Sequence, residues 1–322
     1  MKAMIYERYG APEVVHLAEI DKPVEKENEI LIRVRAASVN PLDWHYMRGE
    51  PYLVRMSAGY RKPKITRLGA DLAGVVEAVG SQVTMFKVGE EVFGSRTGAF
   101  GEYVRTQGLA IAPKPANLSF EQAAAVPIAA LTALQGLRDK GRIQAGQQVL
   151  INGASGGVGT FAVQIARALG AEVTGVCSTR NLEMVSSIGA AHVIDYTAED
   201  FTQNGKRYDL ILDNVGTHSL SDTLRALTPQ GSLVVAGGLN NGRWLGPMTD
   251  IIKASLRARF VSQKLLSLLA QSNREDLLFL KELIEAGKIT PVIDRTYPLE
   301  QVPEAIGYVE AGHARGKVVI TI

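Results

Sequence analysis

The chain has 322 residues, which is enough for two domains of ordinary size. Hydrophobic residues make up 46% of the chain and charged residues 21%, a globular composition that excludes an intrinsically disordered chain. The formal net charge of +2 is too small to make a nucleic acid the expected partner through bulk electrostatics.

The sequence carries no sign of export or of a membrane span. The opening stretch MKAMIYERYG mixes charged and apolar residues and lacks the apolar core of a secretory signal. No run approaches the roughly 18 apolar residues of a membrane-spanning helix. Cys177 is the only cysteine, so an intrachain disulfide is excluded. We therefore expect a cytoplasmic protein.

The first third of the chain is predicted to be mainly β. Ile30, Ile32 and Val34 recur at every second position, which predicts a half-buried strand over 30–36. Between 69 and 101, short apolar runs alternate with glycines, a pattern typical of strands joined by tight turns. These features predict a compact β-rich domain.

After Pro127 the pattern changes to strands that alternate with helices, which is typical of βαβ units around a parallel sheet. The elements predicted here are strands at 148–151, 172–177, 208–213 and 232–236 and helices at 161–169 and 273–286. The tail predicts a strand, a helix and a strand, at 291–298, 303–310 and 317–322. We expect this tail to rejoin the first domain, so that residues 1–122 and 272–322 form one domain and residues 123–271 the other.

A glycine-rich turn at 153–159 joins the first of these strands to its helix. Gly156 and Gly157 remove side chains that would block a close approach to a pyrophosphate, and Gly159 lets the helix pack on the strand. Ala154 stands where the common dinucleotide fingerprint has its first glycine. The alternative is a tight turn that serves only helix–sheet packing. The residues predicted to bind the phosphates are Ser155, Gly156, Gly157 and Val158.

The end of the second strand bears on the choice of coenzyme. The sequence continues as Cys177-Ser-Thr-Arg-Asn181, with no acidic residue to hold a ribose hydroxyl or to repel a 2′-phosphate. Ser178 and Thr179 can donate hydrogen bonds, and Arg180 offers a planar charged group suited to phosphate. NADPH is therefore expected rather than NADH. The alternative for Arg180 is a solvated side chain at a helix start.

Soft metal ligands are scarce in this chain. One cysteine cannot build a four-cysteine zinc site, and none of the five histidines is spaced with another as a ligand pair. We expect no metal, so a substrate carbonyl must be polarised by hydrogen bonds instead.

Taken together, these residues resemble the medium-chain dehydrogenase/reductase superfamily, specifically its zinc-lacking quinone oxidoreductase branch of zeta-crystallin-like proteins. The resemblance rests on Val39-Asn-Pro-Leu-Asp43, the stretch 69–80 with Asp71, the glycine turn, and Gly316-Lys-Val-Val319. It implies an α/β protein with a GroES-like catalytic domain and an inserted Rossmann domain, whose parallel sheet is doubly wound. The implied activity is hydride transfer from NADPH to a quinone or an α,β-unsaturated carbonyl.

The resemblance also implies site residues. Asn40 is expected beside the nicotinamide and Asp43 close behind it, although Asp43 could serve only as a turn cap. His45 stands where relatives carry Tyr or Lys, and it is either a proton donor or a structural histidine. Lys317 could reach the cleft, but a position at the surface is expected. Further coenzyme contacts are expected from Thr132, Tyr196, Val215, Gly237 and Gly238, whose alternatives are a helix cap, strand-edge packing and plain turns.

Two basic stretches and a rival function complete the predictions. The resemblance places a variable loop over the substrate opening at 51–67, with aromatic residues lining a pocket and solvated charges. The other basic run comprises Lys253, Arg257, Arg259 and Lys264.

The rival to an enzyme is an NADPH-binding sensor or nucleic-acid-binding protein of the same fold, which the scattered cations disfavour. The resemblance further implies a homodimer formed through edge strands of the Rossmann sheet.

Overall fold

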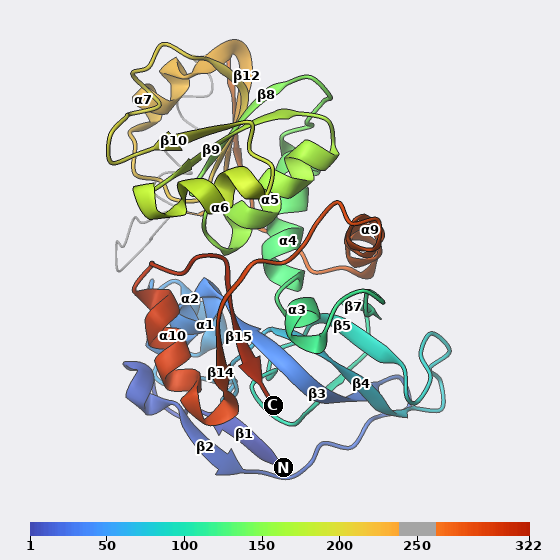
Figure 1. The fold of residues 1–322 in the computed structure, drawn as a ribbon. Coiled ribbons are helices and arrows are strands. Elements are labelled where there is room, and N and C mark those ends of the chain that lie inside the picture. Colours follow the sequence, from blue (N-terminus) through green and yellow to red (C-terminus); the bar gives the residue numbers. More distant parts are fainter. Residues whose placement is uncertain (238–261) are drawn as a thin grey trace. The chain divides into compact units, whose positions relative to one another are not determined.

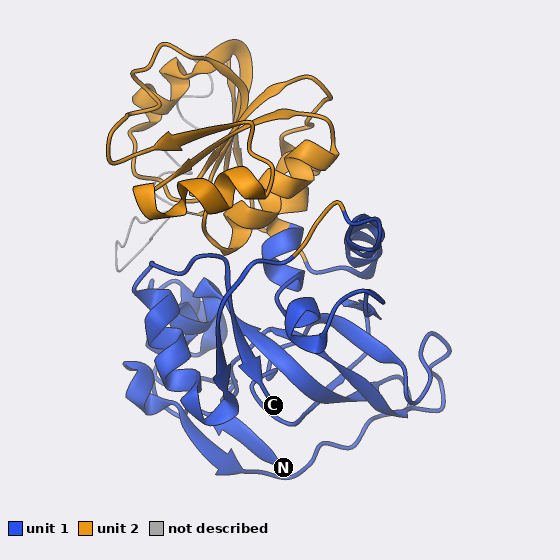
Figure 2. Cartoon of the chain, viewed as in Figure 1, with its two compact units in different colours: residues 1–131, 272–287, 291–322 blue, residues 132–271, 288–290 orange. Residues whose placement is uncertain are grey.

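The computed structural model describes residues 1–237 and 262–322, and it divides the chain into two compact units (Figure 2). Unit 1 comprises 1–131, 272–287 and 291–322, and unit 2 comprises 132–271 and 288–290. The first division lies within a helix, later than the expected 122/123 boundary, because α3 (Phe120–Ala124) packs on the sheet of unit 1. Residues 288–290 belong to unit 2 because the side-chain amide of Gln164 donates a hydrogen bond to the Thr290 carbonyl and accepts one from the Thr290 N–H.

Unit 1 is built on a seven-stranded sheet in the order β14-β15-β3-β4-β5-β7, with β6 also paired to β3. All its neighbouring strands are antiparallel except β14 and β15. A separate hairpin joins β1 (Lys2–Ile5) and β2 (His16–Glu19). The strands of the sheet are β3 (Ile30–Val39), β4 (Asp71–Val79), β5 (Glu91–Ser95), β6 (Tyr103–Thr106), β7 (Ile111–Pro113), β14 (Ile293–Pro298) and β15 (Lys317–Thr321).

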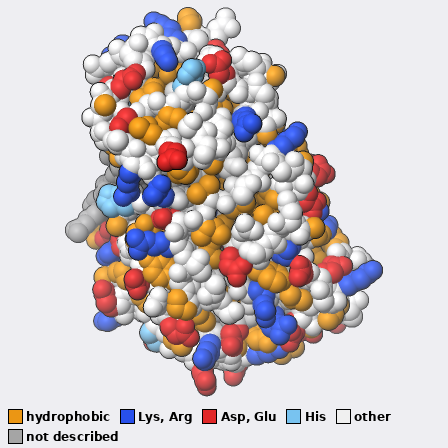
Figure 3. Space-filling view, viewed as in Figure 1, with side chains coloured by type: hydrophobic (Ala, Val, Ile, Leu, Met, Phe, Trp, Pro, Cys, Tyr) orange, Lys and Arg blue, Asp and Glu red, His pale blue; other side chains and the backbone are white. Residues whose placement is uncertain are grey.

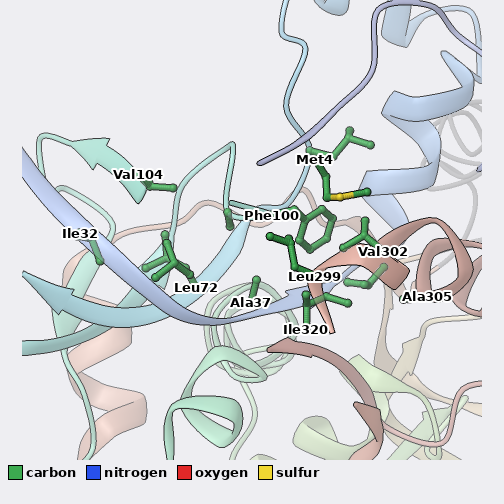
Figure 4. Packing of buried hydrophobic residues seen from close by; sticks show 14 of the residues in the cluster. Met4, Ile32, Ala37, Leu72, Phe100, Val104, Leu299, Val302, Ala305 and Ile320 are labelled. Carbon is green, nitrogen blue, oxygen red and sulfur yellow. The ribbon is translucent and has the colours of Figure 1, made fainter. Parts of the chain in front are cut away.

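The tail rejoins unit 1 as expected, because β15 pairs antiparallel with β3 and lies beside it in Figure 1. The register sets Val318 opposite Val39, so the start of β15 meets the end of β3. Buried side chains from both ends of the chain share one core, in which Met4 and Phe100 lie close to Val302 and Ile320 (Figure 4). Unit 1 therefore forms only when the amino-terminal and carboxyl-terminal segments come together.

The β-rich prediction for the first domain missed a helix at Pro41–Arg48, α1, although its start and stop signals are present. Asn40 caps the helix, Pro41 occupies its first turn, and Gly49 ends it with a φ of 61°. The remaining helices of unit 1 are α2 (Val54–Ala58), α9 (Arg274–Glu285) and α10 (Val302–Glu310), with 3-10 turns at Pro12–Val14 and Leu299–Gln301.

Unit 2 contains a six-stranded, wholly parallel sheet in the order β10-β9-β8-β11-β12-β13. This order confirms the predicted doubly wound Rossmann sheet. Its strands are β8 (Gln148–Asn152), β9 (Glu172–Cys177), β10 (His192–Asp195), β11 (Tyr208–Asp213), β12 (Leu227–Val235) and β13 (Lys264–Ser267). The helices described in unit 2 are α5 (Gly157–Ala168), α6 (Leu182–Ser187) and α7 (Leu220–Arg225), with a 3-10 turn at Thr179–Asn181. The helix α4 (Pro127–Leu134) begins in unit 1 and continues into unit 2 as a π-helix at Gln135–Lys140.

In the ranges 1–237 and 262–322, no helix combines the length and the apolar character that crossing a bilayer requires.

The carboxyl group of Asp43 is fully buried in the first turn of α1. Its Oδ2 accepts the Asn40 N–H at 2.8 Å, and its Oδ1 accepts the Gly69 N–H at 3.0 Å. Burial raises the pKa of Asp43 from 3.8 to about 7, even though both hydrogen bonds favour the ionised form. The turn-cap role is therefore real, and it places a group that titrates near neutrality inside unit 1.

This buried carboxyl makes the stability of the protein depend on pH in a defined direction. Since the folded protein binds the Asp43 proton more tightly than the unfolded chain, that contribution is complete below pH 3.8 and is lost as the pH rises through about 7. We expect the Tm of the wild type minus that of Asp43→Asn to fall between about pH 4 and about pH 7 and to level off at higher pH. Calorimetry measures both values, and exposed Asp21→Asn is the matched control. A difference in Tm between the wild type and Asp43→Asn that does not change with pH would contradict the raised pKa of the buried Asp43 carboxyl.

Candidate functional site

Asp71 is the centre of a buried polar cluster in unit 1. Register pairs Ser38 on β3 with Asp71 on β4, and Asp71 with Ser95 on β5, so the three side chains lie in one row. Both serine hydroxyls donate to the carboxylate at 3.1 Å. The N–H of Ile128, in the first turn of α4, donates to it at 3.0 Å. The carboxylate therefore also satisfies a helix N-terminus, where negative charge is favoured.

Lys317 completes this cluster, and the expectation of a surface lysine is wrong. Its side chain is only 3% exposed, because the pairing of β15 with β3 brings it beside Asn40. The ammonium donates to Asn40 Oδ1 at 2.6 Å and lies 3.6 Å from Asp71 Oδ2. Burial lowers the pKa of Lys317, while Asp71 and Asp43 oppose that shift.

The cluster fixes the orientation of the Asn40 amide, the first predicted active-site group. Its oxygen faces the ammonium, and its NH₂ donates to Asp71 Oδ2 at 2.9 Å and to the Ser38 carbonyl at 3.4 Å. Because an ammonium only donates and a carboxylate only accepts, the amide cannot be flipped without loss of both contacts. The structure therefore brings Asn40 and Asp43 together, as predicted, and adds Asp71 and Lys317.

His45 lies in the last turn of α1 in a setting that suits a structural role. Its Nδ1 is 2.7 Å from the Glu50 carbonyl, which can only accept, so Nδ1 carries a proton and Nε2 of the neutral ring is an acceptor. The ring stacks on Trp44 with centroids 3.6 Å apart. Burial lowers the pKa of His45. A neutral ring with this hydrogen-bonding pattern is a poor proton donor near neutral pH.

The described residues do not fit a zinc site. Across 1–237 and 262–322, no group of three or more His, Cys, Asp or Glu side chains could hold a metal ion. The polar cluster around Asp71 already contains the ammonium of Lys317, which would repel a divalent cation. Cys177 is buried on β9 of unit 2, and burial raises the pKa of its thiol to about 11.

In unit 2, the turn before α5 contains one glycine that packing requires and one that packing does not require. A Cβ at Gly159 would lie 2.0 Å from the Gly153 oxygen, so packing of the turn requires that glycine. A Cβ at Gly156 would meet only the Gly153 oxygen, at 3.6 Å, so packing does not require this one. Gly156 is also the N-cap of α5 and provides no side-chain cap. Open space before the free N–H groups of a helix start suits an anion, and it favours coenzyme binding over the packing alternative.

The ends of β9 and β10 bring the predicted adenosine-side residues together. Register pairs Cys177 with Asp195, and the Tyr196 N–H donates to the Cys177 carbonyl at 3.0 Å. Arg180 is exposed, and Tyr196 is 62% exposed, which is unusual for a tyrosine that serves only packing. An exposed arginine and an exposed aromatic ring that follow the ends of two neighbouring strands suit a phosphorylated ribose.

Asn181 connects this region to the glycine turn, a role that the sequence did not reveal. Its Nδ2 donates to Ser155 Oγ at 3.0 Å and to Ser178 Oγ at 3.1 Å. Its Oδ1 is buried without a hydrogen-bond partner among the described residues. The two predicted serines are thus held by one amide, at the ends of neighbouring strands.

The segment Cys177–Asn181 contains no acidic residue, but Asp195 on the neighbouring strand β10 reaches Thr179. Thr179 Oγ donates to Asp195 Oδ2 at 2.5 Å, and Thr197 donates to Oδ1 through its N–H and its hydroxyl. These hydrogen bonds hold the pKa of Asp195 below its usual range, so the group stays ionised. The Thr179 hydroxyl is therefore already engaged by a carboxylate.

Of the remaining predicted coenzyme residues, Val215 and Gly237 follow the carboxyl ends of β11 and β12, and Thr132 lies in α4. Val215 lies against the glycine turn, since a Cβ at Gly153 would be 2.6 Å from its Cγ2, and its N–H donates to Asp213 at 3.0 Å. Gly237 follows β12, and a Cβ there would be 2.6 Å from the Asn214 oxygen. Thr132 is nearly buried in the second half of α4. The predictions for Gly238, Lys253, Arg257 and Arg259 lie outside the described residues.

Comparisons with known proteins agree with this architecture. Residues 26–116 match the family model "Alcohol dehydrogenase GroES-like domain", and residues 188–320 match "Zinc-binding dehydrogenase". The chain is 36% identical over 360 aligned residues to the mitochondrial NAD(P)H oxidoreductase RTN4IP1 of Bos taurus, covering 100% of this chain and 89% of that protein. It is 33% identical over 335 aligned residues to the chloroplastic NADPH-dependent alkenal/one oxidoreductase of Arabidopsis thaliana, covering 99% and 79%.

A solved structure gives the same result. The Escherichia coli quinone oxidoreductase complexed with NADPH superposes with a TM-score of 0.85 at 28% identity, covering 100% of both chains. With relatives of this kind across its whole length, the protein is an oxidoreductase that uses a nicotinamide coenzyme. The chain belongs to the medium-chain dehydrogenase/reductase superfamily, in its zinc-lacking, quinone oxidoreductase-like branch.

Proposed function

We propose that the protein transfers hydride from NADPH to a quinone or an α,β-unsaturated carbonyl without a metal ion. The observation that carries this proposal is the cluster of Asn40, Asp71 and Lys317, whose cationic charge is an ammonium instead of a metal. Oxidation of a saturated alcohol is disfavoured, because no group in the cluster would lower the pKa of the alcohol as zinc does.

The residues of unit 2 support NADPH as the coenzyme, which supplies the hydride when bound. The N–H groups at Gly157 and Val158 would bind its diphosphate at the start of α5, beside Gly156, whose own N–H donates to the Gly153 carbonyl at 3.1 Å. Arg180 and Tyr196 would hold the 2′-phosphate. Asp195 does not exclude this assignment, because both of its carboxylate oxygens already accept hydrogen bonds from Thr179 and Thr197.

In unit 1, Asn40 would contact the reacting groups and Lys317 would act as a positioning residue. The hydrogen bond from Asn40 to the Ser38 carbonyl is long, at 3.4 Å, so it is the contact of this amide that an acceptor oxygen could replace at the least cost. The shorter bonds from Lys317 and to Asp71 would hold the amide while it does so. The final proton would come from water, since the neutral His45 ring is a poor donor.

The proposed reaction is tested by an acceptor panel. Purified protein is given NADPH or NADH with quinones, enones and saturated ketones, and the products are identified by mass spectrometry. We expect coenzyme oxidation with quinones or enones, a saturated product from an enone, and faster turnover with NADPH. Turnover with saturated ketones alone contradicts the proposal.

The same panel separates the enzyme from its rival, a coenzyme-binding sensor or nucleic-acid-binding protein. Lys and Arg side chains lie among Asp and Glu over the face shown in Figure 3 and do not form one continuous basic stripe. This distribution favours the enzyme. Salt-dependent RNA binding together with no turnover for any acceptor would instead support the rival.

Arg180→Ala tests the coenzyme assignment. Loss of a charged hydrogen bond to the 2′-phosphate should weaken NADPH binding by roughly tenfold or more, because such bonds contribute about 1.5–3 kcal/mol. The KM for NADPH should rise while the KM for NADH stays the same, as steady-state kinetics can measure. Arg142→Ala, at another exposed arginine of unit 2, is the matched control. An unchanged KM for NADPH removes Arg180 from the site.

Two broader expectations remain predictions. A homodimer would use an edge strand of the unit 2 sheet, either β10 or β13. The cytoplasmic location also stays a prediction, and the names of the two relatives described above place those proteins in mitochondria and chloroplasts.

A further inference from the structure

Residues 54–66 of unit 1, here called the basic segment, include α2 and the loop that follows it. The segment contains four cationic residues and no Asp or Glu. Three large apolar side chains on it face solvent: Met56 is 76% exposed, Tyr60 80% and Ile65 56%. A folded unit rarely leaves such side chains together in water unless they meet another surface.

The segment is held by hydrogen bonds, so this exposure is a feature of the fold. The Lys64 N–H donates to the Ala58 carbonyl at 2.7 Å, and the Tyr9 hydroxyl donates to the Gly59 carbonyl at 2.6 Å. Ala58 and Pro63 are buried beneath the segment. The apolar side chains of Met56, Tyr60 and Ile65 are therefore presented outward by an anchored backbone, and the expectation that Tyr60 lines a pocket has no support in its exposure.

Three of the four cations have no partner within the described part of the chain. Arg61, Lys62 and Lys64 are exposed, and their side chains form no ion pair or hydrogen bond with a residue in 1–237 or 262–322. Arg55 differs, since its guanidinium packs over the ring of Tyr9 and donates to the Gly49 carbonyl. The three unpaired cations leave a positive charge beside the exposed apolar side chains.

The positive charge continues past the end of the segment. Burial and the positive charges of Arg96 and Arg105 lower the pKa of Arg67, which follows the segment in the chain. The exposed cations of the segment, Arg61, Lys62 and Lys64, would attract an anionic surface before contact is made.

We propose that the basic segment docks on the surface of an anionic phospholipid bilayer. Unpaired Lys and Arg side chains suit lipid phosphates and carboxylates, tyrosine favours the headgroup level, and Met56 and Ile65 can enter the acyl boundary. A nucleic acid would satisfy the cations but leave Met56 and Ile65 in water. An anionic bilayer would bind both the cations and the exposed apolar side chains of the segment.

If the proposed function holds, docking on a bilayer would also bring the enzyme close to its substrates. Quinones and long-chain enones partition into bilayers, so an enzyme held at the lipid surface meets them at high local concentration. The docking proposal itself concerns binding alone. It can therefore fail or hold independently of turnover.

The test is co-sedimentation of the full-length protein with vesicles, without coenzyme or acceptor. One set of vesicles is phosphatidylcholine alone, and the other contains about a third phosphatidylserine, which supplies the negative surface potential. We expect binding to the anionic vesicles only, with an affinity that falls as salt rises. Lys62→Glu with Lys64→Glu should weaken this binding by roughly tenfold or more. The double change Lys140→Glu with Lys206→Glu alters net charge equally at exposed sites of unit 2 and should bind like the wild type.

A second variant tests the apolar half of the segment. Ile65→Ser keeps every cation and should weaken binding to anionic vesicles at high salt, where insertion contributes most. Circular dichroism melting confirms that each variant is folded. Equal binding by the two charge variants, no sedimentation of the wild type with anionic vesicles at low salt, or capture by single-stranded RNA but not by vesicles would each overturn the proposal.

Discussion

The ammonium of Lys317 lies inside unit 1 between the amide oxygen of Asn40 and the carboxylate of Asp71. Breaking a buried ion pair of this kind from one side costs about 3–5 kcal/mol, so each partner requires the others. The cluster forms only when β15, from the end of the chain, pairs with β3, from its beginning. The same pairing joins the carboxyl-terminal strands to the sheet and orients the amide that we place beside the reacting groups.

Local patterns were enough to predict much of the molecule. The bounds of β9 and β11 and the glycine turn before α5 follow from apolar runs, glycine spacing and the strand–turn–helix order, which involve neighbours in sequence. Asn40 and Asp43 were expected from the resemblance of a short motif to the family, and the structure joins them by two hydrogen bonds. The missed features depend on register between distant strands: Lys317 is buried by β3, and Asp195 meets Thr179 across two parallel strands.

Membership of a family does not by itself decide the chemistry of a site. The carboxyl-terminal part of the chain matches a family model described as a zinc-binding dehydrogenase, yet the described residues hold no set of ligands for zinc. A lysine ammonium can supply charge and hold an amide, but it cannot coordinate a substrate oxygen as a Lewis acid does. The reaction that suits this cluster is one in which the acceptor is already electron-poor.

The most direct test of metal-free hydride transfer compares zinc content with turnover. Purified protein is analysed by inductively coupled plasma mass spectrometry, and NADPH oxidation by its best acceptor is followed before and after treatment with a strong chelator. We expect full turnover in protein that contains far less than one zinc per chain, with no change after chelation. Turnover that disappears with the chelator and returns in proportion to added zinc would contradict a cluster organised around Lys317.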